Sequence, residues 1–337
     1  MMRGTFTALI TPMRPDGSID WDGVERLVEF QIANGVDGLV PAGTTGESPT
    51  LEEDEYRRLI RQVVTSAAGR VPVIAGAGSN STRKALALAD MAEEAGADGL
   101  LLVDPYYNGP GSLEIRREYL EPVARAFPRM EIVPYVVPAR TGTALEPHDL
   151  AQLRLDCPNV VAVKEASGGL RQASAVRRLC GPDFGLFAGD DAGTLDRMLD
   201  GRIRADGVIS VAANLAPAAV STYVRLALGG DGEGACRAER VLSPLLEHIQ
   251  IDVEEGGAVR RSRNPVPIKA MMNLVGLPAG PCRPPLGRLT RAGLNTAVEV
   301  LDQVRRAAPT VFAALPTEVC PLGPDDPSLC YPEGVAL

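Results

Sequence analysis

A lysine at the end of an apolar run carries more chemical potential than any other feature of this sequence. Lys164 follows the apolar residues 160–163, and only three lysines occur among the 34 lysines and arginines of the chain. Burial disfavours the charged form of an amine, which lowers its pKa and makes it a nucleophile toward carbonyl groups. Lys164 is therefore our first candidate for a Schiff-base residue. The alternative is a strand-end lysine that extends its ammonium into solvent.

Hydroxyl, phenol and guanidinium groups follow other apolar runs in the same way. Thr44 and Thr45 lie between glycines in residues 43–48. Backbone N–H groups there could hold a small carboxylate while the hydroxyls relay a proton, although the glycines could equally form a simple tight turn. Tyr135 could move protons, and Arg140 could bind a carboxylate through two hydrogen bonds. This set suits imine formation better than hydrolysis, because two histidines provide no Ser-His-Asp arrangement.

Short apolar runs alternate with amphipathic segments over the first two thirds of the chain. We expect strands at 5–10, 38–41, 71–75, 99–103, 131–136, 160–164, 184–188 and 207–211. We expect helices between and after them at 21–34, 51–68, 82–95, 112–127, 147–156, 170–179, 192–200 and 217–228. Eight such alternations predict an α/β fold of the TIM (β/α)8 barrel type. An open dinucleotide-binding sheet would need a glycine-rich turn after the first strand, and Ile10-Thr11-Pro12 is not one.

The remaining third of the chain predicts an appendage to the barrel. Two or three further helical segments are expected, at 232–249, 264–275 and 290–307. A proline-rich tail with Cys320 and Cys330 follows, and its composition predicts an extended or poorly ordered strap. We therefore divide the chain into a barrel, a C-terminal helical region and a tail, at residues 1–230, 231–308 and 309–337.

Composition excludes several classes of protein. The formal net charge is -9 and no basic stripe occurs, so we expect no nucleic-acid partner. The apolar runs have strand length, which argues against a membrane span, and the N-terminus has no signal-peptide pattern. Six separated cysteines and two histidines show no metal-ligand spacing, so we expect neither a metal nor another cofactor. A cytoplasmic enzyme is the resulting expectation.

The strand-end motifs resemble those of one protein family, in the same order and spacing. They are GTTGES at 43–48, DPYYN at 104–108, YVVPARTG at 135–142, VAVKEASG at 161–168, GDD at 189–191 and GVISVAAN at 207–214. Together with NPVPIK at 264–269, they make residues from about Gly4 to Arg306 similar to the dihydrodipicolinate synthase/N-acetylneuraminate lyase family.

The resemblance implies catalytic roles for four residues. Lys164 would form the imine with pyruvate. Tyr135 would donate and accept protons, linked through the Thr44 hydroxyl to Tyr107, which in this family reaches in from a neighbouring subunit. The resemblance therefore implies a homo-oligomer, either a dimer or a tetramer.

It also implies how the substrates bind. Thr45 and its backbone would hold the pyruvate carboxylate, while the Ile209 main chain and Gly189 line the site. Arg140 would bind the carboxylate of the second substrate, a small aldehyde. In the synthase branch of the family this aldehyde is L-aspartate-4-semialdehyde, and the paired threonines and Arg140 favour that branch.

Two departures from the family pattern affect the interpretation. Val136 stands where the family usually has asparagine, so an apolar side chain replaces an amide beside Tyr135, a change that bears on the identity of the aldehyde. In members inhibited by lysine, a carboxylate at position 84 binds the effector's ammonium, whereas Lys84 should repel it. We expect weak or absent feedback inhibition. The implied effector site comprises Ser48, Tyr56, Asn80, Lys84 and Tyr106.

Two alternatives to the synthase remain open. One is another pyruvate aldolase or sugar-acid dehydratase that uses the same Lys164 imine. The other is a barrel without catalysis that serves as a binding or accessory subunit. For the tail, we expect Cys320 and Cys330 to be thiols rather than an oxidised latch, because disulfides are rare in the cytosol.

Overall fold

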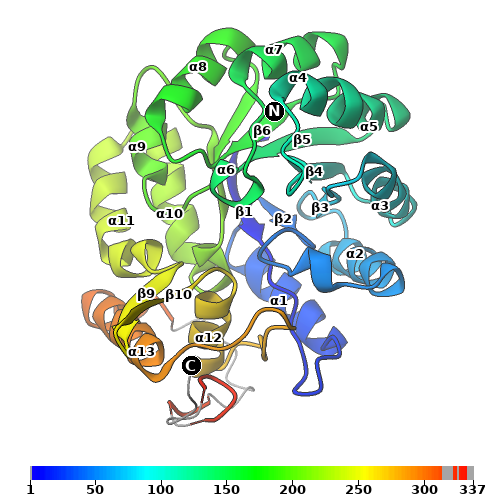
Figure 1. Ribbon diagram of the computed structural model, residues 1–337. Helices are drawn as coiled ribbons and strands as arrows, with labels where there is room; N and C mark the ends of the chain where they lie inside the picture. The colour runs from blue at the N-terminus through cyan, green and yellow to red at the C-terminus, as the bar shows by residue number, and fades with distance from the viewer. Residues whose placement is uncertain (1, 313–321, 325, 332–337) are drawn as a thin grey trace.

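Eight parallel strands form a closed barrel in the computed structural model, which describes residues 2–312, 322–324 and 326–331 (Figure 1). The strands are hydrogen-bonded in the order β2-β1-β8-β7-β6-β5-β4-β3, and a parallel bridge between Leu39 and Val73 closes β2 against β3. The predicted TIM barrel is thereby confirmed. The strands are β1 Gly4–Ala8, β2 Gly38–Val40, β3 Ile74–Gly76, β4 Gly99–Val103, β5 Glu131–Val136, β6 Ala162–Glu165, β7 Gly185–Ala188 and β8 Gly207–Ser210.

Helices surround the barrel close to the predicted positions (Figure 1). No helix among the described residues is long and apolar enough to cross a membrane. The helices up to residue 228 are α1 Trp21–Ala33, η1 Ser48–Thr50, α2 Glu53–Ala67, α3 Thr82–Glu94, α4 Ser112–Glu114, η2 Ile115–Leu120, α5 Glu121–Ala126, α6 Pro138–Thr141, α7 Pro147–Asp156, α8 Leu170–Cys180, α9 Thr194–Leu199, η3 Ala212–Asn214 and α10 Pro217–Leu228.

The single helix predicted at 112–127 is instead three segments, with a π-helical turn, η2, between α4 and α5. Pro122 lies just after this turn and has no backbone N–H to bond to the carbonyl of Glu118. That carbonyl accepts a hydrogen bond from Thr82 Oγ1 at 2.7 Å instead. The proline therefore accounts for the change in helix type.

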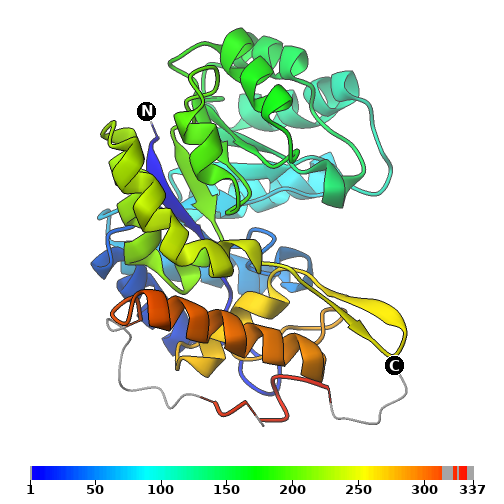
Figure 2. The same ribbon diagram turned by 90° about the vertical axis from the view of Figure 1, so that its left-hand side faces the viewer.

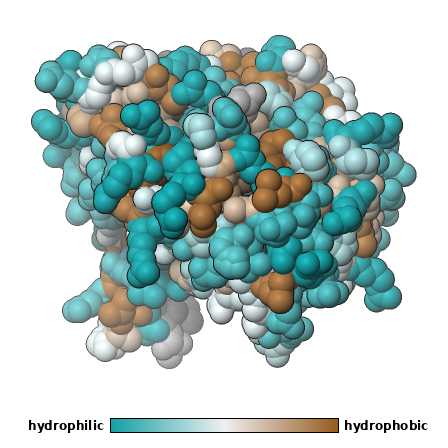
Figure 3. All heavy atoms as spheres, turned by 90° about the horizontal axis from the view of Figure 1, so that it is seen from above, coloured by the Kyte–Doolittle hydropathy of each residue, from teal (hydrophilic) through white to brown (hydrophobic). Residues whose placement is uncertain are grey.

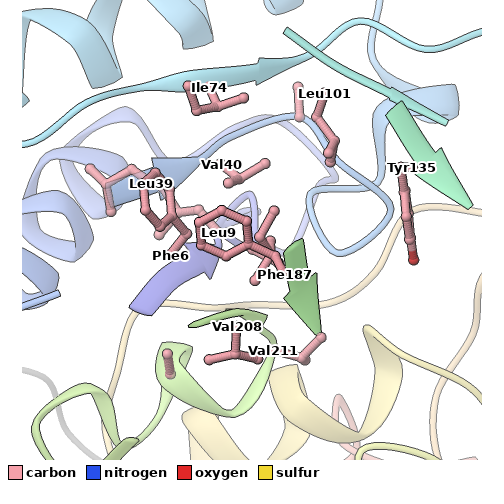
Figure 4. Packing of buried hydrophobic residues seen from close by; sticks show 14 of the residues in the cluster. Phe6, Leu9, Leu39, Val40, Ile74, Leu101, Tyr135, Phe187, Val208 and Val211 are labelled. Carbon is pink, nitrogen blue, oxygen red and sulfur yellow. The ribbon is translucent and has the colours of Figure 1, made fainter. Parts of the chain in front are cut away.

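Aromatic rings fill the barrel interior beneath the carboxyl ends of the strands. Phe6 and Phe187 meet edge to face with their centroids 5.2 Å apart (Figure 4). Gly38 makes room for this pair, because a Cβ there would lie 2.1 Å from the Phe6 ring. Phe187 is in register with Lys164 on the neighbouring strand, so the surroundings of the lysine on this side are apolar.

The C-terminal region contains a β-hairpin that we did not predict. After α11 (Gly232–Glu247), the strands β9 (Ile251–Glu255) and β10 (Ala258–Ser262) pair in antiparallel fashion and project beside α13 (Figure 2). Gly256 and Gly257 form the turn with φ of 62° and 76°, values that glycine adopts at little cost. The paired glycines between alternating residues were the available signal. The helices α12 Val266–Leu274 and α13 Arg291–Ala307 follow.

The described residues of the tail lie against the C-terminal helices. Leu289 forms a parallel bridge with Cys330, and the backbone N–H of Leu322 donates to the carbonyl of Asn273 at 3.0 Å. Cys330 is a buried free thiol. Cys320 lies outside the described residues.

A buried ion pair joins the C-terminal region to the loop after β2. Lys269 of α12 donates from Nζ to Glu47 Oε1 at 2.8 Å, and also to the carbonyls of Thr11 and Pro281. The second oxygen of Glu47 accepts from the backbone N–H of Arg283 at 2.8 Å. All three ammonium protons and both carboxylate oxygens are therefore bonded, which is what a buried pair requires.

Removing one partner of this pair should destabilise the protein strongly. We expect Lys269→Met to lower the free energy of unfolding by about 3–5 kcal/mol, because it leaves the Glu47 charge buried and uncompensated. Urea denaturation measures the change. Lys84→Met is the matched control, since Lys84 is exposed and its replacement should alter stability by less than about 0.5 kcal/mol. Equal effects of the two substitutions would contradict the role given to the pair.

Candidate active site

Residues from several strand ends surround one open cavity of about 710 Å³ at the carboxyl end of the barrel. Chemistry in TIM barrels gathers at this end, where the loops after the strands meet. Six of the eight site residues expected from the sequence line this cavity, and they come from the ends of β2, β5, β6 and β7. These six are Thr44, Thr45, Tyr135, Arg140, Lys164 and Gly189.

Lys164 is buried, with 4% of its surface exposed, so its ammonium does not extend into solvent. Its strand register places it beside Tyr135, and Nζ lies 4.3 Å from the centroid of the Tyr135 ring. Burial lowers the pKa of Lys164 from 10.5 to about 8; Asp191 and Asp190 oppose this shift and Arg140 adds to it. The uncharged fraction of this amine near neutral pH is therefore much larger than that of an ordinary lysine, whose pKa is about 10.4.

The two aspartates near this amine have other partners. Asp191 accepts hydrogen bonds from the Ser210 hydroxyl and from the backbone N–H groups of Val211, at 2.8 Å, and Ala212, at 3.3 Å. Asp190 lies 3.8 Å from the guanidinium of Arg197. Neither carboxylate forms an ion pair with Lys164, which leaves the amine available to a substrate.

Tyr135 is suited to hold a proton. Burial raises the pKa of its phenol to about 12, against the attraction of Arg140 and a hydrogen bond with the Thr44 side chain, so the group stays protonated at neutral pH. Its ring stands at the edge of the apolar cluster, with the hydroxyl directed away from that cluster (Figure 4). Lysine, phenol and threonine hydroxyl thus occupy one side of the cavity.

Asn264 is a site residue to which the sequence gave no role. Its Nδ2 donates to Thr45 Oγ1 at 3.0 Å, while its backbone carbonyl accepts from Arg140 Nη2 at 3.4 Å. Its Oδ1 is buried and has no hydrogen-bond partner among the described residues. The NPVPIK motif was visible, but a contact between residues 219 positions apart has no local signal.

Two expected site residues lie elsewhere in this single chain. Tyr107 is 89% exposed on the loop after β4 and has φ of 79°, an unusual conformation for a residue with a side chain. Ile209 is fully buried in β8, in register with Phe6, and Val211 lines the cavity from this end of the barrel. Among the described residues, no group of three or more His, Cys, Asp or Glu could hold a metal ion.

Burial of the Lys164 ammonium should reduce stability, because the amine binds a proton less readily in the folded protein than in the unfolded chain. This cost is fully present below pH 8 and disappears as the pH rises toward 10.5. We therefore expect Lys164→Met to stabilise the fold at pH 7 by on the order of 2 kcal/mol, and by less at pH 10. Urea denaturation at both pH values measures the difference. A Lys164→Met variant less stable than the wild type at pH 7 would be evidence against the buried amine.

A (β/α)8 barrel with a buried, weakly basic lysine at the end of its sixth strand is typical of class I aldolases, which bind a carbonyl substrate as an imine. The chain belongs to the dihydrodipicolinate synthetase family, whose model matches residues 1–304. It is 43% identical over 286 residues to the 4-hydroxy-tetrahydrodipicolinate synthase of Nitrosococcus oceani, covering 85% of this chain and 92% of the relative. It is 45% identical over 258 residues to the synthase of Chelativorans sp., covering 77% and 86%.

Solved structures agree with the sequence relatives. The 4-hydroxy-tetrahydrodipicolinate synthase of Methylacidiphilum fumariolicum superposes with a TM-score of 0.85 at 36% identity, covering 93% of this chain and 99% of that one. Dihydrodipicolinate synthase of Thermotoga maritima gives a TM-score of 0.82 at 36% identity, with 90% and 99% covered.

Proposed function

We propose that this protein condenses pyruvate with L-aspartate-4-semialdehyde to 4-hydroxy-tetrahydrodipicolinate, a step of lysine and diaminopimelate biosynthesis. The observation that carries the proposal is the buried amine of Lys164, 4.3 Å from the ring centroid of Tyr135 in an open cavity. Membership of the dihydrodipicolinate synthetase family and the relatives named as 4-hydroxy-tetrahydrodipicolinate synthases support the proposal.

The proposed reaction proceeds through a covalent imine. Neutral Lys164 attacks the ketone carbon of pyruvate, and water leaves to form the iminium ion. Loss of a C3 proton then gives an enamine, because the iminium accepts the electron pair. The enamine adds to the aldehyde carbon, and the Tyr135 phenol protonates the new alkoxide. The amine of the bound substrate finally displaces Lys164, which releases the product and regenerates the enzyme.

The cavity residues have separate roles in this scheme. Thr45 and the loop around it would hold the pyruvate carboxylate, with the Thr45 hydroxyl oriented by Asn264. Arg140 would bind the carboxylate of the aldehyde through its two-pronged guanidinium. Gly189 and the main chain of Ile209 would complete the cavity wall, while the side chain of Ile209 is buried in β8.

We further propose a homo-oligomer in which Tyr107 completes the proton relay through Thr44 of a neighbouring subunit. Tyr107 and Leu113, 89% and 56% exposed, present an apolar surface after β4, outside their own cavity. Further exposed leucines lie on α7 and α8, and apolar patches interrupt the mostly hydrophilic face in Figure 3. One similar solved structure is described as a monomeric dihydrodipicolinate synthase variant.

The departure at Val136 has little effect on the cavity. Val136 is buried in β5 and does not line the cavity, whereas Tyr135 and Val137 on either side of it do. Val136 therefore gives no reason to prefer another pyruvate aldolase or a sugar-acid dehydratase, and the named relatives favour the synthase. We place the enzyme in the cytoplasm, because the five cysteines in the described residues are all free thiols.

Trapping with pyruvate and borohydride tests the proposed imine. We expect the intact protein to gain the mass of one reduced pyruvate adduct on Lys164. The trapping rate should rise about tenfold per pH unit below pH 8 and become constant above it, because only the uncharged amine reacts. Time courses of intact mass between pH 6 and pH 10 measure this profile.

Two variants give the controls. Lys164→Met should gain no mass, while Lys84→Met should be trapped at the wild-type rate. A wild-type protein that remains unmodified would identify a barrel without catalysis, and a rate still rising at pH 10 would mean an unperturbed lysine. Arg140→Ala should raise the KM for L-aspartate-4-semialdehyde far more than that for pyruvate, which would distinguish this aldehyde from uncharged ones.

The residues of the implied effector site do share a cavity, of about 200 Å³. It is lined by Ser48, Tyr56, Asn80, Lys84 and Tyr106 among others. The buried hydroxyl of Tyr56 has no hydrogen-bond partner among the described residues. Lys84 contributes a positive charge to this cavity, which would repel an effector's ammonium, while Glu53 lines the same cavity with a negative charge.

L-Lysine should therefore inhibit the enzyme weakly or not at all. The measurement is the initial rate against lysine concentration at fixed substrate concentrations. We expect no inhibition at micromolar lysine, and we expect Lys84→Glu, which supplies a carboxylate, to increase sensitivity. A micromolar inhibition constant for the wild type would contradict the expected repulsion.

A further inference from the structure

The rim of the active-site cavity carries a guanidinium that the proposed reaction does not use. Arg263 directly follows β10 and lines the cavity, as Arg140 of α6 does from the barrel side. Its side chain is exposed to solvent, and it forms no ion pair with a carboxylate in the part of the chain that the structure describes.

The hairpin holds this residue at the rim. Gln250 precedes β9 and Arg263 follows β10, and both line the cavity, so the base of the hairpin forms part of the cavity wall. The last pair of the hairpin joins Ser262 to Ile251, whose side chain is buried. The position of Arg263 is therefore set by ordered strand pairing rather than by a free loop.

Arg263 and Arg140 line the same cavity, where their like charges repel each other. Burial lowers the pKa of Arg140, and the neighbouring positive charge of Arg263 lowers it further, while Tyr135 and Asp190 oppose the shift. The Arg140 guanidinium also donates to the backbone carbonyl of Asn264, the residue directly after Arg263. Two like charges beside one cavity cost free energy, which Asp190 offsets only in part and an anion bound between them would recover.

The acidic side chains of the cavity do not supply that anion. Asp190 is paired with Arg197, and Asp191 is bonded to Ser210 and to the backbone after β8. Asp196 and Glu247 also line the cavity, but among the described residues neither forms an ion pair with Arg140 or Arg263. The pair of guanidiniums is thus left for a ligand.

We propose that Arg263 is a specificity-determining residue that binds, together with Arg140, the carboxylate of the acceptor aldehyde. A carboxylate has about four lone-pair positions, enough for two guanidiniums that approach from different sides. The class of acceptor is then a short aldehyde with a carboxylate at the end remote from its carbonyl group. This inference rests on the proposed function and adds a second contact to it.

Steady-state kinetics of Arg263→Gln tests the proposal, with L-aspartate-4-semialdehyde as the varied substrate. We expect its KM to rise about tenfold with little change in kcat, because a contact made equally to substrate and transition state is lost. The KM for pyruvate should not change. Arg263→Lys, which keeps the charge but not the two-pronged donor, should give a smaller rise and remains informative if the glutamine variant folds poorly.

Arg261→Gln is the matched control. It removes the same charge two residues earlier, within β10, but Arg261 pairs with Asp252 at 2.9 Å and does not line the cavity, so the KM values of this variant should match the wild type. The proposal fails if Arg263→Gln leaves the KM for the aldehyde unchanged, if Arg261→Gln raises it equally, or if both substrates are affected alike. Borohydride trapping separates the two proposals: normal trapping with an unchanged KM overturns only the role of Arg263.

Discussion

The free energy of solvating one ammonium group is the constraint on which the site depends. Lys164 is buried beside Phe187 at the carboxyl end of the barrel, where water cannot stabilise the charge of the ammonium, so its pKa falls to about 8. The same burial raises the pKa of the neighbouring Tyr135 phenol to about 12. One environment therefore increases the uncharged fraction of the amine and strengthens the hold of the phenol on its proton.

Nearby charges have to be restrained if that environment is to persist. Two carboxylates lie close enough to Lys164 to favour its protonation. Asp191 is bonded to Ser210 and to two backbone N–H groups, while Asp190 lies beside Arg197. These contacts give the carboxylates other partners, so the amine is influenced by them without being locked to one. The positive charge of Arg140 acts in the opposite direction and also suits the anionic substrates.

The C-terminal region is part of the site rather than a separate layer. Asn264 contacts Thr45, and the buried pair between Lys269 and Glu47 fixes the loop on which Thr44 and Thr45 lie. The β9–β10 hairpin adds Arg263 to the rim. The barrel therefore supplies Lys164 and Tyr135, and the segment after it holds the loop with Thr44 and Thr45 in place.

The sequence by itself was enough to predict the barrel, because strand-length apolar runs and amphipathic helices are local patterns that repeat eight times. It also identified Lys164, since a lysine that ends a buried strand is visible without any coordinates. It could not predict the pairing of Asn264 with Thr45, the hairpin that carries Arg263, or the π-helical turn before Pro122. Those features depend on contacts between segments that are distant in the sequence. The π-helical turn, for example, depends on the hydrogen bond that the Glu118 carbonyl accepts from Thr82. The fall in the pKa of Lys164 was likewise decided by tertiary structure, because only the closed barrel removes water from that amine.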